Sequence, residues 1–189
     1  MSYHFAMPQP KPAPAQPPIV VVMGVSGSGK TTVGKLLAEQ LSVVMLEGDS
    51  LHSAENVKRM AAGTALSDSD RRDWLLAIAQ RIAAASRDGR GLVVSCSALK
   101  RGYRDVLRAG DPNLIFVYLA GDKELIRQRL TLRQDHFMPT ALLDSQFDAL
   151  EAPGVDEPVI SCDIAQSPAD IVRSILARIA AGAPANHAS

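Results

Sequence analysis

Short runs of apolar residues alternate along the chain with stretches in which apolar side chains recur every three or four positions. Continuous apolar runs predict buried strands, and the recurrence predicts helices with one apolar face. The expected strands are 19–23, 43–46, 92–96, 114–119 and 159–164. The expected helices are 30–41, 54–62, a long helix between Ser67 and Gly89, 99–108, 123–133, 141–150 and 168–180. This alternation indicates an α/β fold, in which a parallel sheet is covered by helices on both faces.

Local signals mark the ends of two of these helices. Ser67 is followed three residues later by Asp70, a pattern that resembles a capping box at the start of the long helix. Gly89 closes that helix, and Gly63 is a plausible C-cap for the helix before it.

The residues after the first expected strand carry the clearest chemical signal. They read Gly24-Val25-Ser26-Gly27-Ser28-Gly29-Lys30-Thr31, the phosphate-binding pattern GxxxxGK[ST] between a strand and a helix. Such a loop points backbone N–H groups and a helix N-terminus at a polyphosphate. A glycine-rich stretch can be merely a tight turn, but the complete pattern in this context predicts a site for ATP. The candidate nucleotide-binding residues are Gly24, Val25, Ser26, Gly27, Ser28, Gly29, Lys30, Thr31 and Thr32, with Lys30 on the β- and γ-phosphates and Thr31 on Mg²⁺.

Composition restricts the class of protein. The 189 residues fit one hydrophobic core. Lysine plus arginine and aspartate plus glutamate both number 20, so no global field attracts nucleic acid or an anionic membrane. No apolar run approaches the ~20 residues of a membrane span. Cys96 and Cys162 lie in runs interpreted as central strands and lack CxxC spacing, so we expect buried, reduced thiols in a cytoplasmic protein.

Two tails flank the expected domain. Residues 1–18 are rich in proline, alanine and glutamine, a composition that favours extended and unpacked chain. A ligand for a proline-recognition domain is the alternative interpretation of this segment. Residues 182–189 form a second, short tail, which leaves 19–181 as the folded domain.

Polar residues follow the second and third expected strands where each strand ends. Asp49 and His52 follow the second strand, and Ser97, Lys100 and Arg101 follow the third. Most loop charges are only solvated, but parallel strands bring their carboxyl ends to the same edge of the sheet as the phosphate loop. A carboxylate there can take the proton of an attacking hydroxyl, and cations can hold an anionic acceptor. Asp49 is therefore the candidate base.

These residues closely resemble the gluconokinases, within the P-loop kinases of the nucleoside-monophosphate-kinase-like group. The matching blocks are Met23–Thr31, Glu47-Gly48-Asp49 with His52 and Asn56, Met60–Gly63 with Leu66, Asp68–Arg71 with Trp74-Leu75, Cys96–Arg101 with Tyr103-Arg104-Asp105, His136–Pro139, and Ser145-Gln146-Phe147 with Leu150-Glu151. The resemblance spans essentially residues 19–179. It implies a three-layer sandwich, a five-stranded parallel sheet in the order 2-3-1-4-5, and a helical lid over about 133–143.

The activity implied by the resemblance is ATP- and magnesium-dependent phosphorylation of D-gluconate at its 6-hydroxyl. The residues that it places around the sugar acid are Asp49, His52, Arg59, Arg71, Lys100, Arg101 and Gln146. Two positions depart from the family pattern. Arg59 replaces a usual lysine and keeps its charge, and Asp73 stands where proline is common, in what we expect to be the first turn of a helix.

Two arginines and one absent aspartate complete the set of candidates. Arg129 and Arg133 are four residues apart on one helix face, which in isolation indicates only a solvated surface. In a P-loop kinase this place resembles the start of the lid, so both are candidate catalytic residues beside Lys30 and Asp49. The third expected strand ends in serine and cysteine without an aspartate. Magnesium is then expected to depend on Thr31, phosphates, water and Asp49.

Other interpretations remain open at this stage. Shikimate kinase, adenylate kinase and adenylylsulfate kinase share the same frame, which fold analogy alone does not distinguish, and the Cys96–Arg101 block separates them from the gluconokinases. A nucleotide-binding regulatory module with little turnover is the alternative from another class. A homodimer is compatible with the sequence, which does not indicate the contact surface.

Overall fold

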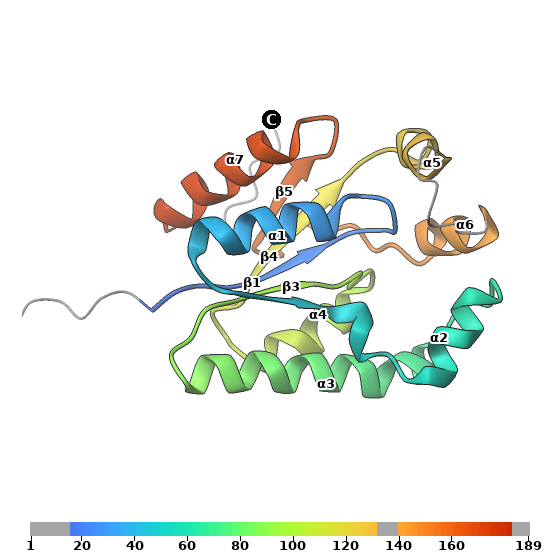
Figure 1. The fold of residues 1–189 in the computed structure, drawn as a ribbon, viewed down its shortest axis with the longest axis horizontal. Helices are drawn as coiled ribbons and strands as arrows, with labels where there is room; N and C mark the ends of the chain where they lie inside the picture. Colours follow the sequence, from blue (N-terminus) through green and yellow to red (C-terminus); the bar gives the residue numbers. More distant parts are fainter. Residues whose placement is uncertain (1–15, 132–139, 183–189) are drawn as a thin grey trace, which may run out of the picture.

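The sheet has the predicted topology. The structure, a computed structural model, describes residues 16–131 and 140–182. Five parallel strands lie in the order β2-β3-β1-β4-β5 (Figure 1). They are β1 (Ile19–Met23), β2 (Val44–Glu47), β3 (Leu92–Ser95), β4 (Ile115–Ala120) and β5 (Val159–Asp163). The predicted parallel sheet and its strand order are confirmed.

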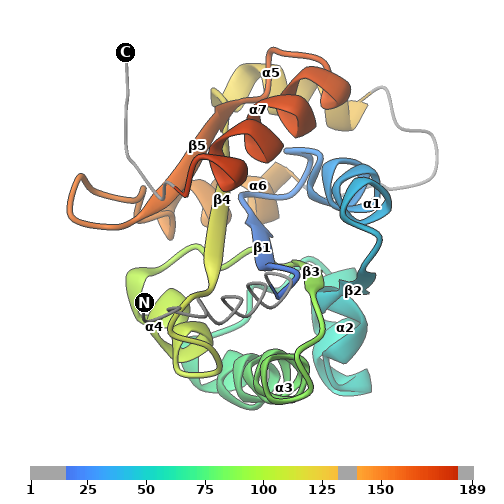
Figure 2. The same ribbon diagram turned by 90° about the vertical axis from the view of Figure 1, so that its left-hand side faces the viewer.

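Helices cover both faces of the sheet. Within the described residues they are α1 (Lys30–Leu41), the 3₁₀ turn η1 (Gly48–Leu51), α2 (Ala54–Ala61), α3 (Asp68–Arg87), α4 (Arg101–Arg108), α5 (Lys123–Thr131), α6 (Thr140–Asp148) and α7 (Pro168–Ala180). Figure 2 shows α1 and α7 on one side of the sheet and α3 and α4 on the other. The three-layer sandwich is therefore confirmed. None of these helices combines the length and apolarity that crossing a membrane requires.

Strand β1 shows why its sequence is continuously apolar. All five of its residues are buried, because helices pack on both faces of the central strand. Val20 and Val22 belong to the hydrophobic cluster under α1 and α7. Val21 and Met23 belong to the cluster over α3 and α4. Because successive side chains of a strand point to opposite faces of the sheet, β1 contributes to both hydrophobic clusters.

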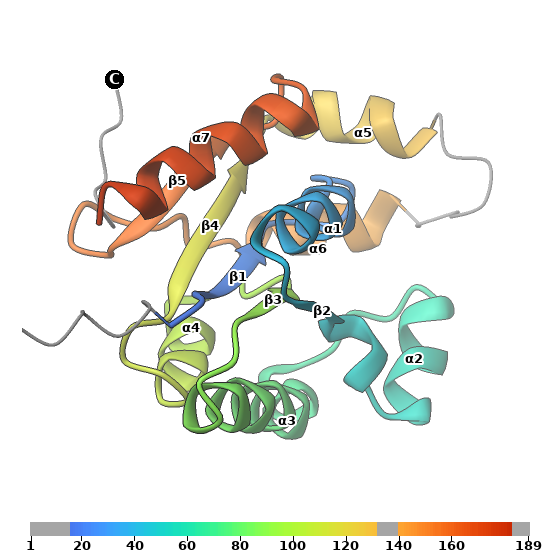
Figure 3. The ribbon, with the colours of Figure 1, turned by 60° about the vertical axis from the view of Figure 1, so that its left-hand side comes forward.

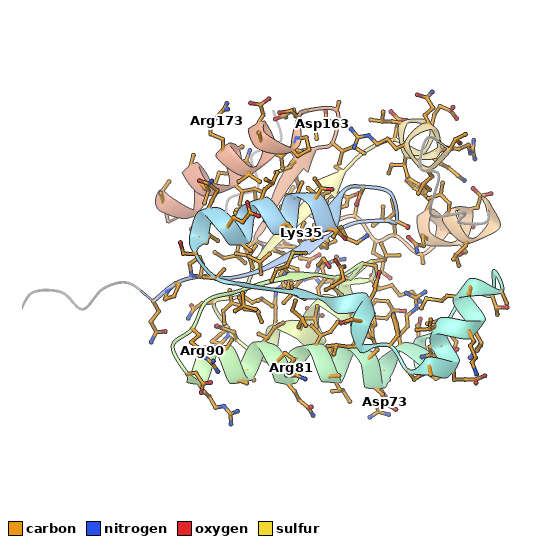
Figure 4. All side chains as sticks on the ribbon, in the orientation of Figure 1. Lys35, Asp73, Arg81, Arg90, Asp163 and Arg173 are labelled. Carbon is orange, nitrogen blue, oxygen red and sulfur yellow. The ribbon has the colours of Figure 1, made fainter. Side chains whose placement is uncertain are left out.

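The ends of the helices follow the sequence signals closely. Ser67 and Asp70 form a complete capping box at the start of α3. Gly63 and Gly89 follow the ends of α2 and α3 with φ of 77° and 63°, the left-handed region that glycine adopts easily. The expected position of Asp73 in the first turn is wrong, because α3 already begins at Asp68. Asp73 instead points into solvent from the outer side of α3 (Figure 4).

The predicted placement of the two cysteines needs a correction. Cys96 comes immediately after β3, and Cys162 lies on β5, which is an edge strand of the sheet. Both thiols are nevertheless buried and unpaired, as expected. Burial raises the pKa of the Cys96 thiol to about 12. Helices cover both faces of the sheet, so even an edge strand buries its inward side chains.

The carboxyl end of the sheet holds the phosphate loop and the smaller helices. Figure 1 shows α2, α5 and α6 gathered at this end. In Figure 3, α5 lies above the start of α1 and α2 lies below it. Much of the predicted lid, 133–139, and most of both predicted tails lie outside the described residues.

Candidate active site

The phosphate loop, residues 24–31, joins β1 to α1 with the backbone that its glycines require. Gly24 has φ of 145°, and a Cβ there would lie 3.0 Å from the Leu119 carbonyl oxygen. Gly29 has φ of 97° and caps α1 without any side-chain hydrogen bond. The first N–H groups of α1 therefore have no side-chain cap. Together with the helix dipole, they suit the N-terminus of α1 to a phosphate.

Two polar side chains of the loop support this assignment. Ser28 is only 2% exposed, and its Oγ has no hydrogen-bond partner within the described part of the chain. A buried hydroxyl without a partner is costly, and a phosphate oxygen would satisfy it. The Lys30 ammonium donates to the Val25 carbonyl oxygen at 3.0 Å and therefore lies over the loop. These residues fit a polyphosphate.

A cavity of about 270 Å³ lies beside the loop, between α1, α5 and the start of α7. Gly27, Thr32 and Pro168 are among the residues that line it. Arg129 also lines it, and its guanidinium donates to the Ile164 carbonyl oxygen at 2.6 Å. The structure thus places Arg129 against the segment after β5. Arg133 lies outside the described residues.

The residues predicted to bind the acceptor, which form the predicted acceptor side, begin at the end of β2. Asp49 is exposed on η1, and His52 follows it and stacks on Trp74, with ring centroids 4.3 Å apart. The Trp74 indole donates to the Gly48 carbonyl oxygen at 2.8 Å, which holds the stack in place. Nδ1 of His52 is buried and has no hydrogen-bond partner among the described residues. Burial lowers the pKa of His52, the Asp49 charge opposes this effect, and Arg71 adds to it.

Charges from both halves of the site converge near the end of β3. Burial is the main cause that raises the pKa of the Cys96 thiol, and the charges of Asp49, Lys30 and Arg71 also affect that pKa. Lys30 comes from the phosphate loop, whereas Asp49 follows β2 and Arg71 belongs to α3. The fold therefore brings the candidate base, the predicted phosphate-binding lysine and one predicted acceptor cation to the same end of the sheet.

A second group of contacts organises the cations of the acceptor side. Asp68 accepts from the Lys100 ammonium at 2.8 and 2.9 Å and from the Tyr103 hydroxyl at 2.5 Å. Lys100 and Arg71 lie 5.7 and 6.0 Å from the centre of the Tyr103 ring. These hydrogen bonds, that from Lys100 first, lower the pKa of Asp68. Burial and the Asp68 contact raise the pKa of Tyr103, which therefore remains a hydroxyl donor.

Two predicted acceptor cations have partners of their own. Arg59 forms a 2.8 Å ion pair with Asp70, which joins α2 to α3. Hydrogen bonds from Ser67 are the main cause that lowers the pKa of Asp70 to about 2. Arg101 forms a 2.6 Å pair with Asp156 on the loop before β5. The structure therefore groups Lys100 with Arg71, but directs Arg101 toward a separate loop.

Gln146 lies in direct contact with the phosphate loop. Its Oε1 accepts a hydrogen bond from the Ser26 backbone N–H at 2.6 Å. The two residues are 120 positions apart in sequence. No sequence signal indicated this contact, although both residues were site candidates.

Sequence reasoning also missed the buried arginine that shapes the acceptor loop, which is residues 96–100 between β3 and α4. Arg104 on α4 and Glu157 are 1% and 3% exposed and form a 2.5 Å ion pair. The same guanidinium donates to the carbonyl oxygens of Ala98, Leu99 and Glu151 at 3.1–3.2 Å. It thereby fixes residues 98–99, where Ala98 has φ of 42°, and α4 starts at Arg101 rather than at the expected Leu99. Arg104 was seen in the sequence only as part of a family block.

Searches against known proteins identify the family. A family model described as an AAA domain matches residues 19–153. The thermoresistant gluconokinase of Escherichia coli (strain K12) is 45% identical over 165 residues, which cover 87% of this chain and 94% of that protein. The chain belongs to the gluconokinase family. The crystal structure of a gluconokinase from Sinorhizobium meliloti 1021 has a TM-score of 0.81 at 45% identity and covers 90% of this chain and 95% of that one.

Two further structures help to place the gluconokinase fold. A sugar kinase from Janibacter sp. HTCC2649 has a TM-score of 0.83 at 43% identity and covers 90% of this chain and 99% of that one. The adenylylsulfate (APS) kinase CysC of Mycobacterium tuberculosis reaches a TM-score of 0.66 at 18% identity, with 88% of this chain and 99% of that one covered. The latter likeness concerns the fold alone. Sequence identity therefore separates the gluconokinases from a kinase that shares their frame.

Proposed function

We propose that this protein transfers the γ-phosphoryl group of ATP to the 6-hydroxyl of D-gluconate, giving 6-phospho-D-gluconate and ADP. The observation that carries the proposal is that two buried polar atoms without a partner among the described residues, Ser28 Oγ in the phosphate loop and His52 Nδ1 after β2, lie at the same end of the sheet. One set of groups suits a polyphosphate and the other suits a polyhydroxylated anion. Family membership supports the same reaction.

The candidate residues divide the chemistry between them. Asp49 accepts the proton of the 6-hydroxyl as the oxygen–phosphorus bond forms and the bond to ADP breaks. Lys30 stabilises the charge on the transferring phosphoryl group. Arg71 and Lys100, carried on the Tyr103 ring, hold the gluconate carboxylate. His52 stays neutral near pH 7 because burial lowers its pKa, so its Nδ1 accepts from a gluconate hydroxyl.

Magnesium fits this site when phosphate oxygens supply most of its ligands. Within the described residues, no group of three acidic, histidine or cysteine side chains could hold a metal alone. Thr31 lies in the first turn of α1, and Glu47 accepts from the Ser95 hydroxyl at the end of β3. Glu47 lies on the same strand face as Met45, whose side chain lies against Gly34 of α1. The Glu47 carboxylate is therefore on the face of the sheet that α1 covers, and we assign it to the ion together with Thr31. When bound, the ion neutralises phosphate charge.

The remaining assignments concern the nucleotide and the cell. The cavity lined by Arg129 and Pro168 suits the nucleoside part of ATP, because it adjoins the phosphate loop. Arg133 and the lid over 133–143 are proposed to close over the phosphates. A cytoplasmic location, the lack of a nucleic-acid partner and a homodimer remain predictions.

A substrate panel tests the function. Gluconate should be phosphorylated at least ~100-fold more efficiently than glucose, because glucose lacks the carboxylate whose charged hydrogen bonds to the site cations are worth about 3 kcal/mol. A coupled ADP-release assay with gluconate, glucose, shikimate and nucleoside monophosphates measures this ratio. Lys100→Ala should raise KM for gluconate more than KM for ATP, whereas Lys35→Ala on the exposed side of α1 should change neither. Comparable efficiency with glucose would contradict the proposal.

A further inference from the structure

The contact between Gln146 and Ser26 occupies one backbone N–H group of the phosphate loop. Ser26 lies inside the phosphate loop, whose backbone N–H groups bind phosphate oxygens. Its N–H donates at 2.6 Å to Gln146 Oε1, which is a neutral oxygen. One N–H group makes one strong hydrogen bond, so the carboxamide and a phosphate compete for it.

The chain that follows Gln146 is bonded to the acceptor loop. The Glu151 N–H donates to the Leu99 carbonyl oxygen at 2.9 Å, and the Glu151 carboxylate accepts from the Arg101 N–H at 2.7 Å. Arg104 joins the same two segments through the carbonyl oxygens of Leu99 and Glu151. On its other side, α6 is held to α5 by the 2.8 Å pair of Lys123 and Asp144. Helix α6 therefore physically connects the phosphate loop to the loop that carries Lys100.

We propose that Gln146 couples the two substrate sites by exchanging partners. Its carboxamide holds the Ser26 N–H until a phosphate oxygen of ATP takes that N–H. The released side chain then hydrogen-bonds the acceptor. The second half of this exchange rests on the proposed function, because it takes gluconate as the acceptor, whereas the first half concerns nucleotide binding alone.

The exchange predicts coupled binding. Nucleotide must displace Gln146 from the Ser26 N–H before it can bind there, so the Gln146–Ser26 bond lowers the apparent affinity for nucleotide. The free energy of a typical net hydrogen bond corresponds to a change of about 3- to 10-fold in that affinity. Nucleotide in turn frees Gln146, so gluconate should bind more tightly in its presence. Linkage requires the reverse effect to have the same size.

Nucleotide affinity without any acceptor tests the first half. Titration calorimetry with the ATP analogue AMPPNP and Mg²⁺ should show Gln146→Ala and Gln146→Asn binding about 3- to 10-fold more tightly than the wild type. Gln146→Glu should bind more weakly, because its carboxylate still reaches Ser26 and repels phosphate. Ser145→Ala, which removes only a local bond to Leu142, should leave the affinity unchanged.

The exchange predicts a higher nucleotide affinity for Gln146→Ala and Gln146→Asn and a lower one for Gln146→Glu, whereas a merely structural role of Gln146 predicts no gain in affinity for any of them. If Gln146→Ala and Gln146→Asn, both folded by thermal melting, bind AMPPNP with unchanged or lower affinity, the exchange is refuted. Either variant suffices if the other fails to fold.

Gluconate affinity with and without AMPPNP tests the second half. The wild type should bind gluconate several-fold more tightly with the analogue, and Gln146→Ala should lose this difference. An equal difference in both proteins refutes the coupling. Failure of gluconate to bind either protein overturns the proposed function and the acceptor half, and leaves the result for nucleotide standing.

Discussion

Replacing Arg104 by methionine should destabilise the protein far more than removing a surface arginine. The side chains of Arg104 and Glu157 are 1% and 3% exposed, so methionine leaves a buried carboxylate without its main partner. It also removes the donor to the carbonyl oxygens of Ala98, Leu99 and Glu151. Removing one partner of a buried ion pair typically lowers the free energy of unfolding by 3–5 kcal/mol, and we expect a loss of about 3 kcal/mol here.

The lower end of that range applies because one partner remains. Arg108, which is partly exposed, also donates to Glu157 at 3.0 Å. For a chain of this size, 1 kcal/mol shifts Tm by about 2–4 °C, so Arg104→Met should lower Tm by about 6–12 °C. Differential scanning calorimetry measures this shift. Steady-state kinetics should also show a higher KM for gluconate, because residues 98–99 lose their anchor.

The pH dependence identifies the charge as the cause. Hydrogen bonds from Arg104, ahead of those from Arg108, lower the pKa of Glu157 from its ordinary 4.5. The ionised pair therefore contributes its full stability above pH 4.5, and the contribution is lost as the pH falls through the lowered pKa. The gap in Tm between wild type and Arg104→Met should narrow accordingly on acidification.

An exposed pair on α7 is the matched control. Arg173 and Asp170 lie 2.8 Å apart with 77% and 50% of their side chains exposed, so Arg173→Met should change stability by less than about 0.5 kcal/mol. Arg104→Met combined with Glu157→Met also removes the buried carboxylate and should be less destabilising than the sum of the single changes. An Arg104→Met protein as stable as Arg173→Met would refute the reasoning.

Three further predictions concern the site. Lys30→Ala should abolish phosphoryl transfer and leave the melting curve intact, because the lysine serves phosphate rather than the core; near-normal turnover would exclude the assigned role. Asp49→Asn should lower kcat by ~100-fold or more with little change in nucleotide affinity, and unchanged kcat would remove Asp49 as the base. Burial lowers the pKa of His52 below 6.5, so on acidification the unfolded chain binds this proton first and stability falls as the pH drops below about 6.5. His52→Phe should flatten that part of the Tm–pH curve, and an unchanged curve would show that His52 does not cause the loss of stability.

The sequence predicts most of the fold because its local signals agree with one another. Apolar runs, glycines after helices and the Ser67–Asp70 box all mark elements that the structure contains within a few residues of the expected bounds. Errors occur where packing overrides the local signal. Leu99 follows an apolar strand and looks helical, but Arg104 holds its carbonyl oxygen and delays α4 to Arg101.

The site was less predictable than the fold, because its organisation depends on long-range pairs. Motif and resemblance named Lys30, Asp49 and Lys100, and topology explains why they lie at one end of the sheet. Neither source reveals that two cationic side chains lie over the Tyr103 ring, or that Gln146 contacts the phosphate loop 120 residues away in sequence. A buried arginine such as Arg104 also reads from sequence as an ordinary surface charge.

Trp74 is the single tryptophan of the chain, and it stacks on His52. All indole fluorescence of the protein therefore originates against a proposed acceptor residue. Imidazolium quenches indole emission more strongly than neutral imidazole does, so the emission follows both the protonation of His52 and any movement of its ring. The native protein thus carries its own optical probe for the acceptor side, and binding there can be followed without a label.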